Sequence, residues 1–519
     1  MSTDRCSGVL LHPSSLPGPD GIGDLGPEIF QWIDFLAESG CQLWQVLPLG
    51  PTGYGDSPYQ CFSAFAGNPY LVSPTLLFDE GLLQRNDLVD RPTFPDDNVD
   101  FGPVIEWKIK LLERSYKRFT RKKNKTLLNE FSEFVEENKD WLDDYALFMA
   151  IKSDQNNASW EHWSAELRRR DPVAIGKFKE DHAARINEQK YRQFLFFRQW
   201  KNVRSYANDA GIKIIGDIPI FIAYDSADAW SHPDLFYLDK KGIPSVVAGV
   251  PPDYFSVTGQ LWGNPLYKWS SHKNSGYQWW IKRVKAVLNL VDIVRLDHFR
   301  GFEAYWEIPY GNPTAEIGRW VKGPQEDLFL ELKHSLGDLP IIAEDLGLIT
   351  EGVVRLRDMF NLPGMKILQF AYASDPDDAF LPHNFPQNCY AYTGTHDNDT
   401  SRGWYDKATE KEKDFCRRYL SVSGDDISWS MMRSIWQSVA LHVLAPMQDL
   451  LSLGTQARMN MPGAASGNWA WRMAPGALSD FLKHRLYELN YLYGRLPETE
   501  KQKLRLIELK AQEAEVKPH

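Results

Sequence analysis

Three short acidic motifs stand out because each lies just after a short, mostly apolar run. They are Arg295-Leu-Asp297-His298, Glu344-Asp345 and His396-Asp397-Asn398-Asp399. A carboxylate can attack the anomeric carbon of a sugar while a protonated carboxyl gives its proton to the leaving oxygen. The motifs therefore indicate chemistry at a glycosidic bond.

The runs that precede these motifs predict the elements that must position them. Residues 291–294, 339–342 and 390–393 are too short for helices and predict buried parallel strands. In an eight-stranded α/β barrel the C-terminal ends of all strands meet on one face. We therefore expect the three motifs to surround one bound molecule although they lie far apart in the sequence.

Eight strand-like segments can be placed along the chain, and amphipathic helical stretches precede several of them. The predicted strands are residues 8–11, 42–47, 212–218, 292–297, 340–345, 365–371, 390–395 and 441–445. The helical stretches include residues 27–39, 193–209 and 277–290. This alternation is typical of parallel sheets. The predicted fold is α/β, a (β/α)8 TIM barrel that forms a single catalytic unit over residues 1–519.

The second and third predicted strands are too far apart for a simple barrel crossover, so the segment between them must have structure of its own. We expect a mainly helical insertion over residues 70–205, with helices at 103–123, 127–138 and 141–154. The C-terminal residues 476–510 are also predicted to be helical.

Residues 244–265 contain turn-forming residues throughout and carry Tyr254, Phe255 and Trp262. We interpret them as a loop over the barrel mouth, within a loop-rich insertion that covers the active site at residues 225–275. The alternative is a loop packed down by its own aromatic side chains.

Side-chain alternation along a strand places Arg295 and Asp297 on the same side. A guanidinium beside a carboxylate favours the ionised form that a nucleophile needs, although a purely structural ion pair fits these residues equally well. Of the neighbours Glu344 and Asp345 only one can face the barrel axis, and alternation does not say which. Either could be the general acid if its surroundings raised its pKa.

The cluster His396-Asp397-Asn398-Asp399, with Asp217 and His298, would also fit a metal site. We favour a hydroxyl-binding cluster instead, because the chain has no His-x-His or His-x-x-x-His pair and charged side chains also bind sugar hydroxyls. No metal or cofactor is expected. The turn-rich residues 53–69 should line the same mouth and offer Tyr54 and Tyr59 as a sugar platform, or form only a tight connection.

Composition excludes several classes of protein. The 58 basic and 69 acidic side chains give a net charge of −11, which argues against nucleic acid as a partner. No apolar stretch is long enough to cross a membrane, and the first residues lack a secretory signal, so we expect a cytoplasmic protein. Five scattered cysteines argue against a disulfide framework. Aromatic residues make up 13% of the chain, which suits a ligand with flat apolar faces such as a sugar.

The sequence resembles the 4-α-glucanotransferases, also called amylomaltases or disproportionating enzymes, of glycoside hydrolase family 77 in the α-amylase clan. The resemblance spans roughly residues 7–500. It is carried by His12-Pro-Ser-Ser-Leu-Pro-Gly18, Gly55-Asp-Ser-Pro-Tyr59, Gly216-Asp-Ile-Pro-Ile220, Val294-Arg-Leu-Asp-His-Phe-Arg-Gly301, Ala343-Glu-Asp-Leu-Gly347, Gly394-Thr-His-Asp-Asn398 and Gly467-Asn-Trp-Ala-Trp-Arg472.

The resemblance implies Asp297 as nucleophile, Glu344 as general acid/base and Asp397 as stabiliser of the transition state. It further implies sugar contacts for Arg295, His396, Asp217, Tyr59, Gln260, Trp262 and Asn468, and an acceptor-side loop with Tyr254 and Phe255. Tyr54 fits a second glucan site, for which no tyrosine partner is found near Phe101.

The implied activity is retaining transfer of α-1,4-glucan segments to the 4-hydroxyl of an acceptor. Alternatives are an α-glucan hydrolase and a non-catalytic glucan-binding protein. Partners would be α-1,4-glucans and maltooligosaccharides, with no membrane or nucleic acid, and the protein would be a monomer or homodimer.

Overall fold

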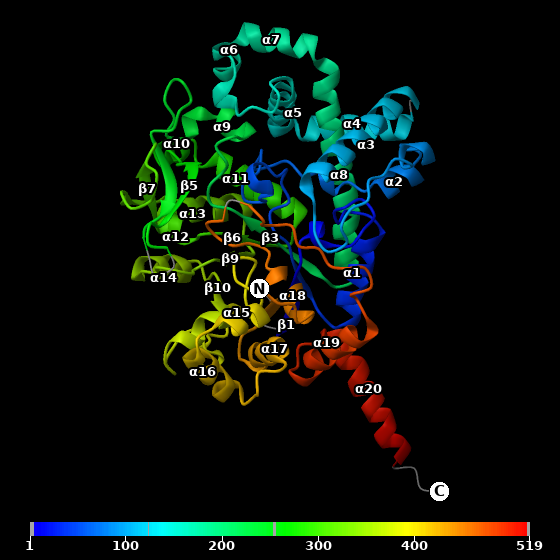
Figure 1. The fold of residues 1–519 in the computed structure, drawn as a ribbon, viewed down its shortest axis with the longest axis vertical. Coiled ribbons are helices and arrows are strands. Elements are labelled where there is room, and N and C mark those ends of the chain that lie inside the picture. Colours follow the sequence, from blue (N-terminus) through cyan, green and yellow to red (C-terminus); the bar gives the residue numbers. More distant parts are fainter. Residues whose placement is uncertain (1–4, 123, 253–255, 465, 516–519) are drawn as a thin grey trace.

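A computed structural model shows eight parallel strands arranged as a barrel (Figure 1). It describes residues 5–122, 124–252, 256–464 and 466–515. The strands, in chain order, are β1 (Cys6–Leu10), β2 (Leu43–Gln45), β3 (Lys213–Ile218), β6 (Ile293–Leu296), β9 (Ile341–Ala343), β10 (Gly364–Ile367), β11 (Cys389–Tyr392) and β12 (His442–Pro446). All eight predicted barrel strands are confirmed. The sixth is shorter than predicted, because the chain turns into the 3₁₀ helix η7 (Leu368–Ala373).

The barrel is closed by the pairing of its first and last strands and by a contact between β9 and β10. β1 pairs in parallel with β12 on one side and β2 on the other. The Ala343 N–H donates to the Pro363 carbonyl at 2.9 Å across the remaining seam. Apolar side chains fill the interior, among them Leu43, Ile215, Ile293, Ile342, Met365, Ile367 and Leu444. The ring therefore has a solid core and presents its polar residues at the C-terminal ends of its strands.

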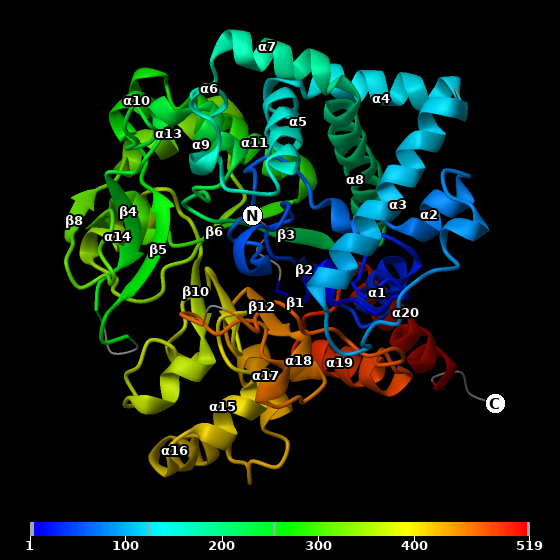
Figure 2. The ribbon, with the colours of Figure 1, turned by 45° about the horizontal axis from the view of Figure 1, so that its top comes forward.

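Helices fill the long segment between β2 and β3 and gather on one side of the barrel in both views (Figures 1 and 2). They are α2 (Pro74–Asp79), α3 (Phe101–Lys122), α4 (Lys125–Glu137), α5 (Lys139–Asp154), α6 (Ala165–Arg168), α7 (Pro172–Asp181) and α8 (Ala183–Asp209). Aromatic rings from several of these helices pack together, for example Phe119 on Tyr191 at 4.7 Å between centroids. α8 begins ten residues before the predicted start at position 193, because its first turns pack on the insertion rather than on the barrel.

A second, antiparallel sheet lies beside the barrel, in the order β5-β4-β7-β8. Its strands are β4 (Val246–Val250), β5 (Gln260–Pro265), β7 (Ala304–Pro309) and β8 (Arg319–Lys322). The prediction of a loop throughout residues 244–265 is therefore wrong for two stretches. The glycine and proline residues of these strands favoured turns in the prediction. In the structure Val247 and Ala248 are buried and pair with β7. Tyr254 and Phe255 lie outside the described residues.

The remaining helices are distributed along the rest of the chain. They are α1 (Pro27–Glu38), α9 (Ala227–Ser231), α10 (Trp269–Asn274), α11 (Gln278–Leu290), α12 (Arg300–Glu303), α13 (Gln325–Leu336), α14 (Glu351–Met359), α15 (Ser401–Lys407), α16 (Glu410–Leu420), α17 (Ile427–Gln437), α18 (Met447–Leu450), α19 (Asp480–Leu492) and α20 (Glu498–Glu515). α20 projects away from the body (Figure 1). None of the described helices is both long enough and apolar enough to cross a membrane.

Arg495, between α19 and α20, fastens the C-terminal region to the N-terminal end of the barrel. Its guanidinium is fully buried and donates to the main-chain carbonyls of Cys6, Trp436, Ser438, Ala440 and Leu441. Charge-assisted hydrogen bonds of this kind satisfy carbonyls that would otherwise be buried without a partner.

Candidate active site

A buried arginine at the C-terminal end of β6 joins two carboxylates from neighbouring strands. Arg295 Nη1 lies 2.6 Å from Asp217 Oδ2 and 2.9 Å from Asp297 Oδ1. The hydroxyl of Tyr59 donates to Asp217 Oδ2 at 2.8 Å. Parallel pairing of Asp217 with Arg295 sets this geometry, because both residues point to the same side of adjacent strands.

Glu344, directly after β9, lies in the same cluster. Its Oε2 accepts a hydrogen bond from the His298 N–H at 2.8 Å, and its Oε1 accepts one from the Leu346 N–H at 3.1 Å. Asp345 points elsewhere, to the Arg357 guanidinium at 2.5 Å and the Met365 N–H at 2.7 Å. Alternation did not decide between Glu344 and Asp345. In the structure Glu344 is the one that lies beside Arg295 and Asp297.

Asp397, beyond β11, occupies the same face. Its Oδ1 accepts a hydrogen bond from Asn460 Nδ2 at 2.6 Å, and its Oδ2 lies 3.3 Å from His396 Nε2. The side chain of Asp397 remains 44% exposed, so it borders the open mouth. The His396 ring stacks on Tyr59 with 5.1 Å between centroids, which links this strand end to the Arg295 cluster.

The three acids have different proton affinities. Burial raises the pKa of Asp297 to about 6, and it outweighs the opposing charge of Arg295. Burial, reinforced by the charge of Asp297, raises the pKa of Glu344 to about 8 against the opposing effect of Arg295. Burial would also raise the pKa of Asp397, but His396, the hydrogen bond from Asn460 and Arg295 together hold it well below its usual range. Arg295 thus acts on Asp297 in the expected direction but does not decide the result.

Two of the other sugar-contact candidates lie beside His298, whose main-chain N–H bonds to Glu344. The Trp262 ring lies 4.9 Å from the His298 ring, and its Nε1 donates to Gln260 Oε1 at 3.1 Å. The amide of Asn468 is engaged within its own loop, where it accepts from the Met461 N–H at 2.9 Å. Tyr54 is 80% exposed. Gln260 and Trp262 are therefore near the acids, whereas Asn468 would have to exchange its partners before it could bind a ligand.

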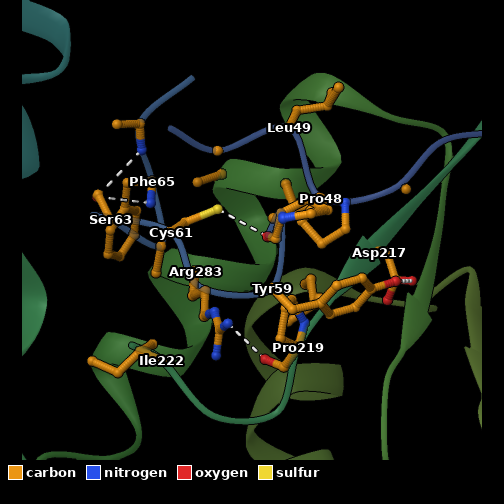
Figure 3. A pocket seen from close by; sticks show the side chains of 18 of the residues that line it. Pro48, Leu49, Tyr59, Cys61, Ser63, Phe65, Asp217, Pro219, Ile222 and Arg283 are labelled. Carbon is orange, nitrogen blue, oxygen red and sulfur yellow. Dashed lines mark hydrogen bonds between the residues drawn. The ribbon is translucent and has the colours of Figure 1, made fainter. Parts of the chain in front are cut away.

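A small cavity of about 70 Å³ lies behind Tyr59 and Asp217 (Figure 3). Apolar side chains such as Leu49 and Ile222 line it, and the Arg283 guanidinium at its edge donates to the Pro219 carbonyl at 2.6 Å. This volume holds about two water molecules and is too small for a sugar ring. No group of three or more potential metal ligands occurs among the described residues.

The family model described as 4-alpha-glucanotransferase matches residues 11–479. The chain belongs to this family. The 4-alpha-glucanotransferase of Thermus thermophilus is 50% identical over 92% of this chain and 97% of its own length. That of Synechocystis is 49% identical over 95% of this chain and 99% of its own.

A solved structure of amylomaltase from Streptococcus agalactiae in complex with acarbose is also similar. It is 40% identical to this chain, with a TM-score of 0.92, and the alignment covers 95% of this chain and all of that one. The fold of this 4-α-glucanotransferase family member is therefore a (β/α)8 barrel with helical insertions, notably between its second and third strands.

Sequence reasoning missed several residues around the acids of this 4-α-glucanotransferase family member. Arg458 and Asn460 bond to Asp397, and Trp469 packs 5.6 Å from Tyr59 and 5.9 Å from His396. These residues follow the last strand in an irregular segment. Trp469 lies within the motif Gly467–Arg472, whereas the spacing of Arg458 and Asn460 carries no signal for a contact with Asp397 more than 60 residues earlier.

Proposed function

We propose that the protein transfers α-1,4-glucan segments from a donor glucan to the 4-hydroxyl of an acceptor, with retention of configuration. The observation that carries the proposal is the joint placement of Asp297 and Glu344 at buried Arg295, where each carboxyl can supply a different step. Family membership supports the choice of reaction and substrate class.

In the first step Asp297 attacks the anomeric carbon of the donor while protonated Glu344 gives its proton to the departing glycosidic oxygen. A covalent glucosyl ester forms on Asp297, and the leaving sugar departs with a free 4-hydroxyl. In the second step ionised Glu344 takes the proton of an acceptor 4-hydroxyl, whose oxygen displaces Asp297. One glycosidic bond is broken and one is formed, so the reaction needs no cofactor.

We assign roles to the surrounding residues from the solvent exposure of their side chains. Asp397 presents a carboxylate to the donor ring and stabilises the positive charge that develops there. The side chain of Asp217 has no exposed surface, so we assign it to holding Arg295 and Tyr59 rather than to direct sugar contact. His396 completes the donor pocket.

Further sugar contacts are proposed at the edges of this pocket. Gln260, Trp262 and Asn468 would bind outer sugars, and residues 225–275, including Tyr254 and Phe255, would cover the acceptor side. Tyr54, on the short helix η2 (Tyr54–Asp56), is a candidate for a separate glucan contact because its ring is exposed.

Maltotriose as the sole substrate separates transfer from hydrolysis. We expect glucose together with chains longer than maltotriose, because acceptor sugar competes with water for the glucosyl ester. Chromatography of the products checks this. Formation of only glucose and maltose would establish a hydrolase, and binding without turnover would establish a non-catalytic glucan-binding protein.

The pH dependence of kcat/KM should be bell-shaped, with most activity between about pH 6 and pH 8. Asp297 must be ionised, so activity falls as the pH drops through its raised pKa of about 6. Glu344 must be protonated for the first step, so activity falls as the pH rises through about 8. Because the two carboxyls interact, the limbs belong to the pair. A profile that is flat from pH 5 to pH 9 would contradict this assignment.

The natural substrates are proposed to be starch- or glycogen-type glucans or maltose-series oligosaccharides. We also propose a cytoplasmic location. It is supported by the free thiols of Cys41, Cys61, Cys389 and Cys416, which are typical of a reducing compartment.

A further inference from the structure

We propose that Arg458 and Asn460 are positioning residues that fix the carboxylate of Asp397 for catalysis. They lie just after the 3₁₀ helix η9 (Thr455–Ala457) and bond to different groups of Asp397. Asn460 Nδ2 donates to the carboxylate Oδ1 at 2.6 Å, and Arg458 Nη2 donates to the main-chain carbonyl of Asp397 at 2.6 Å. The proposal rests on the function of Asp397 proposed above.

The two residues are themselves held in place. Arg458 Nε donates to the Asn460 carbonyl at 2.7 Å, so the guanidinium bridges Asp397 and Asn460. The Asn460 N–H donates to the His396 carbonyl at 3.0 Å. Main chain and side chain of the His396-Asp397 pair are therefore both bonded to the same short segment, which we call the Arg458–Asn460 clamp.

The two carboxylate oxygens of Asp397 have different partners. Oδ1 is occupied by Asn460, whereas Oδ2 lies beside His396 at the mouth, where the side chain is partly exposed. Rotation of the carboxylate would break the Asn460 bond, so Oδ2 keeps one direction toward the donor ring. Preorganised charge of this kind is effective because it needs no reorganisation in the transition state.

The same segment also contacts the donor pocket. The Trp469 N–H donates to the Met459 carbonyl, next to Asn460, at 2.7 Å, and the Trp469 ring packs near Tyr59 and His396. Segment 458–469 thus joins the position of Asp397 to the aromatic wall of the pocket. If the clamp had a purely structural role, its loss would lower the stability of the protein without changing catalysis.

The decisive variant is Asn460→Asp, which keeps the shape of the side chain but replaces the donor with a second carboxylate. We expect kcat for transfer from maltotriose to fall about 10²-fold with little change in KM, because the misplaced group acts mainly in the transition state. The acidic limb of the pH profile should move upward, because two adjacent carboxylates share a proton. Asn460→Ser, which retains a short donor, should lose less activity.

Asn384→Asp is the matched control. The Asn384 amide also donates to two acceptors, the carbonyls of Pro376 and Asp378, but it is exposed. This variant should keep wild-type kcat, KM and pH profile. Thermal midpoints of all variants show whether any loss follows unfolding.

Unchanged kcat and pH profile in folded Asn460→Asp would overturn the clamp, as would a fall in the thermal midpoint without a kcat effect in the remaining folded enzyme. Calorimetric binding of acarbose gives a readout without turnover, and we expect Asn460→Asp to weaken it about tenfold or more. Equal acarbose affinity in wild type and Asn460→Asp would also overturn the clamp. Failure of wild type to elongate maltotriose would instead reject the proposed function and leave the acarbose comparison to decide the clamp.

Discussion

Asp297→Asn is expected to lower kcat for transfer from maltotriose by about 10⁴-fold or more, as removal of a catalytic nucleophile does in other enzymes. An amide oxygen is too weak a nucleophile to form the glucosyl ester. The fold should survive, because Arg295 keeps its 2.6 Å contact with Asp217 Oδ2 when Asp297 loses its charge. Product chromatography measures the activity, and circular dichroism with the thermal midpoint confirms the fold.

Asp338→Asn provides the matched control for Asp297→Asn. The side chain of Asp338 is 98% exposed, and the same atom exchange there should leave activity at the wild-type level. Near-normal transfer by folded Asp297→Asn would reject Asp297 as the nucleophile.

Glu344→Gln should reduce transfer from maltotriose by about 10³-fold or more, because glutamine cannot give a proton to the leaving oxygen. An activated donor separates the two steps. α-Maltotriosyl fluoride has a leaving group that needs little protonation, so Asp297 should still form the glycosyl ester in the variant. The second step lacks its base, and the ester should accumulate as a maltotriosyl mass increase on the intact protein.

Asp345→Asn makes a comparable change one residue further along. Because Asp345 bonds to Arg357 and the Met365 N–H, this variant should lower the thermal midpoint while it retains activity within about tenfold of wild type. Loss of the fluoride reaction in Glu344→Gln, or loss of catalysis in Asp345→Asn with full activity in Glu344→Gln, would contradict the assignment of the general acid.

The barrel could be predicted from the sequence because its strands are short, buried apolar runs that are too short to form helices. Residues such as Ile214 and Ile341 have no exposed surface. The second sheet was missed because its strands do not have this composition. β4 ends in Gly249 and Val250, and β5 contains Gly263 and Pro265, so propensity argued for turns. Pairing of β4 with β5 and with the distant β7, where Gly249 lies opposite Trp306, overrides that propensity.

The positions of the acids were predictable because Asp297 and Glu344 directly follow strands and Asp397 lies a few residues beyond one, and alternation placed Arg295 on the same side as Asp297. The pKa values of these acids were not predictable, because their burial depends on every element around the mouth. The sequence favours ionised Asp297 through Arg295, whereas burial raises its pKa despite that charge. The contacts of Arg458 and Asn460 with Asp397 could not be predicted for a related reason. A hydrogen bond to Asp397 depends on the path of an irregular segment, which no local pattern encodes.

The pairing of β1 with β12, secured by Arg495, has a consequence for how the chain is made. Arg495 donates to the carbonyl of Cys6, 489 positions earlier, and β1 bonds to β12 along its whole length. The N-terminal strand leaves the ribosome long before these partners are synthesised. The ring cannot close until β12, whose His442 pairs with Cys6, has been synthesised, so the edge of nascent β1 remains available to wrong partners and to chaperones until then.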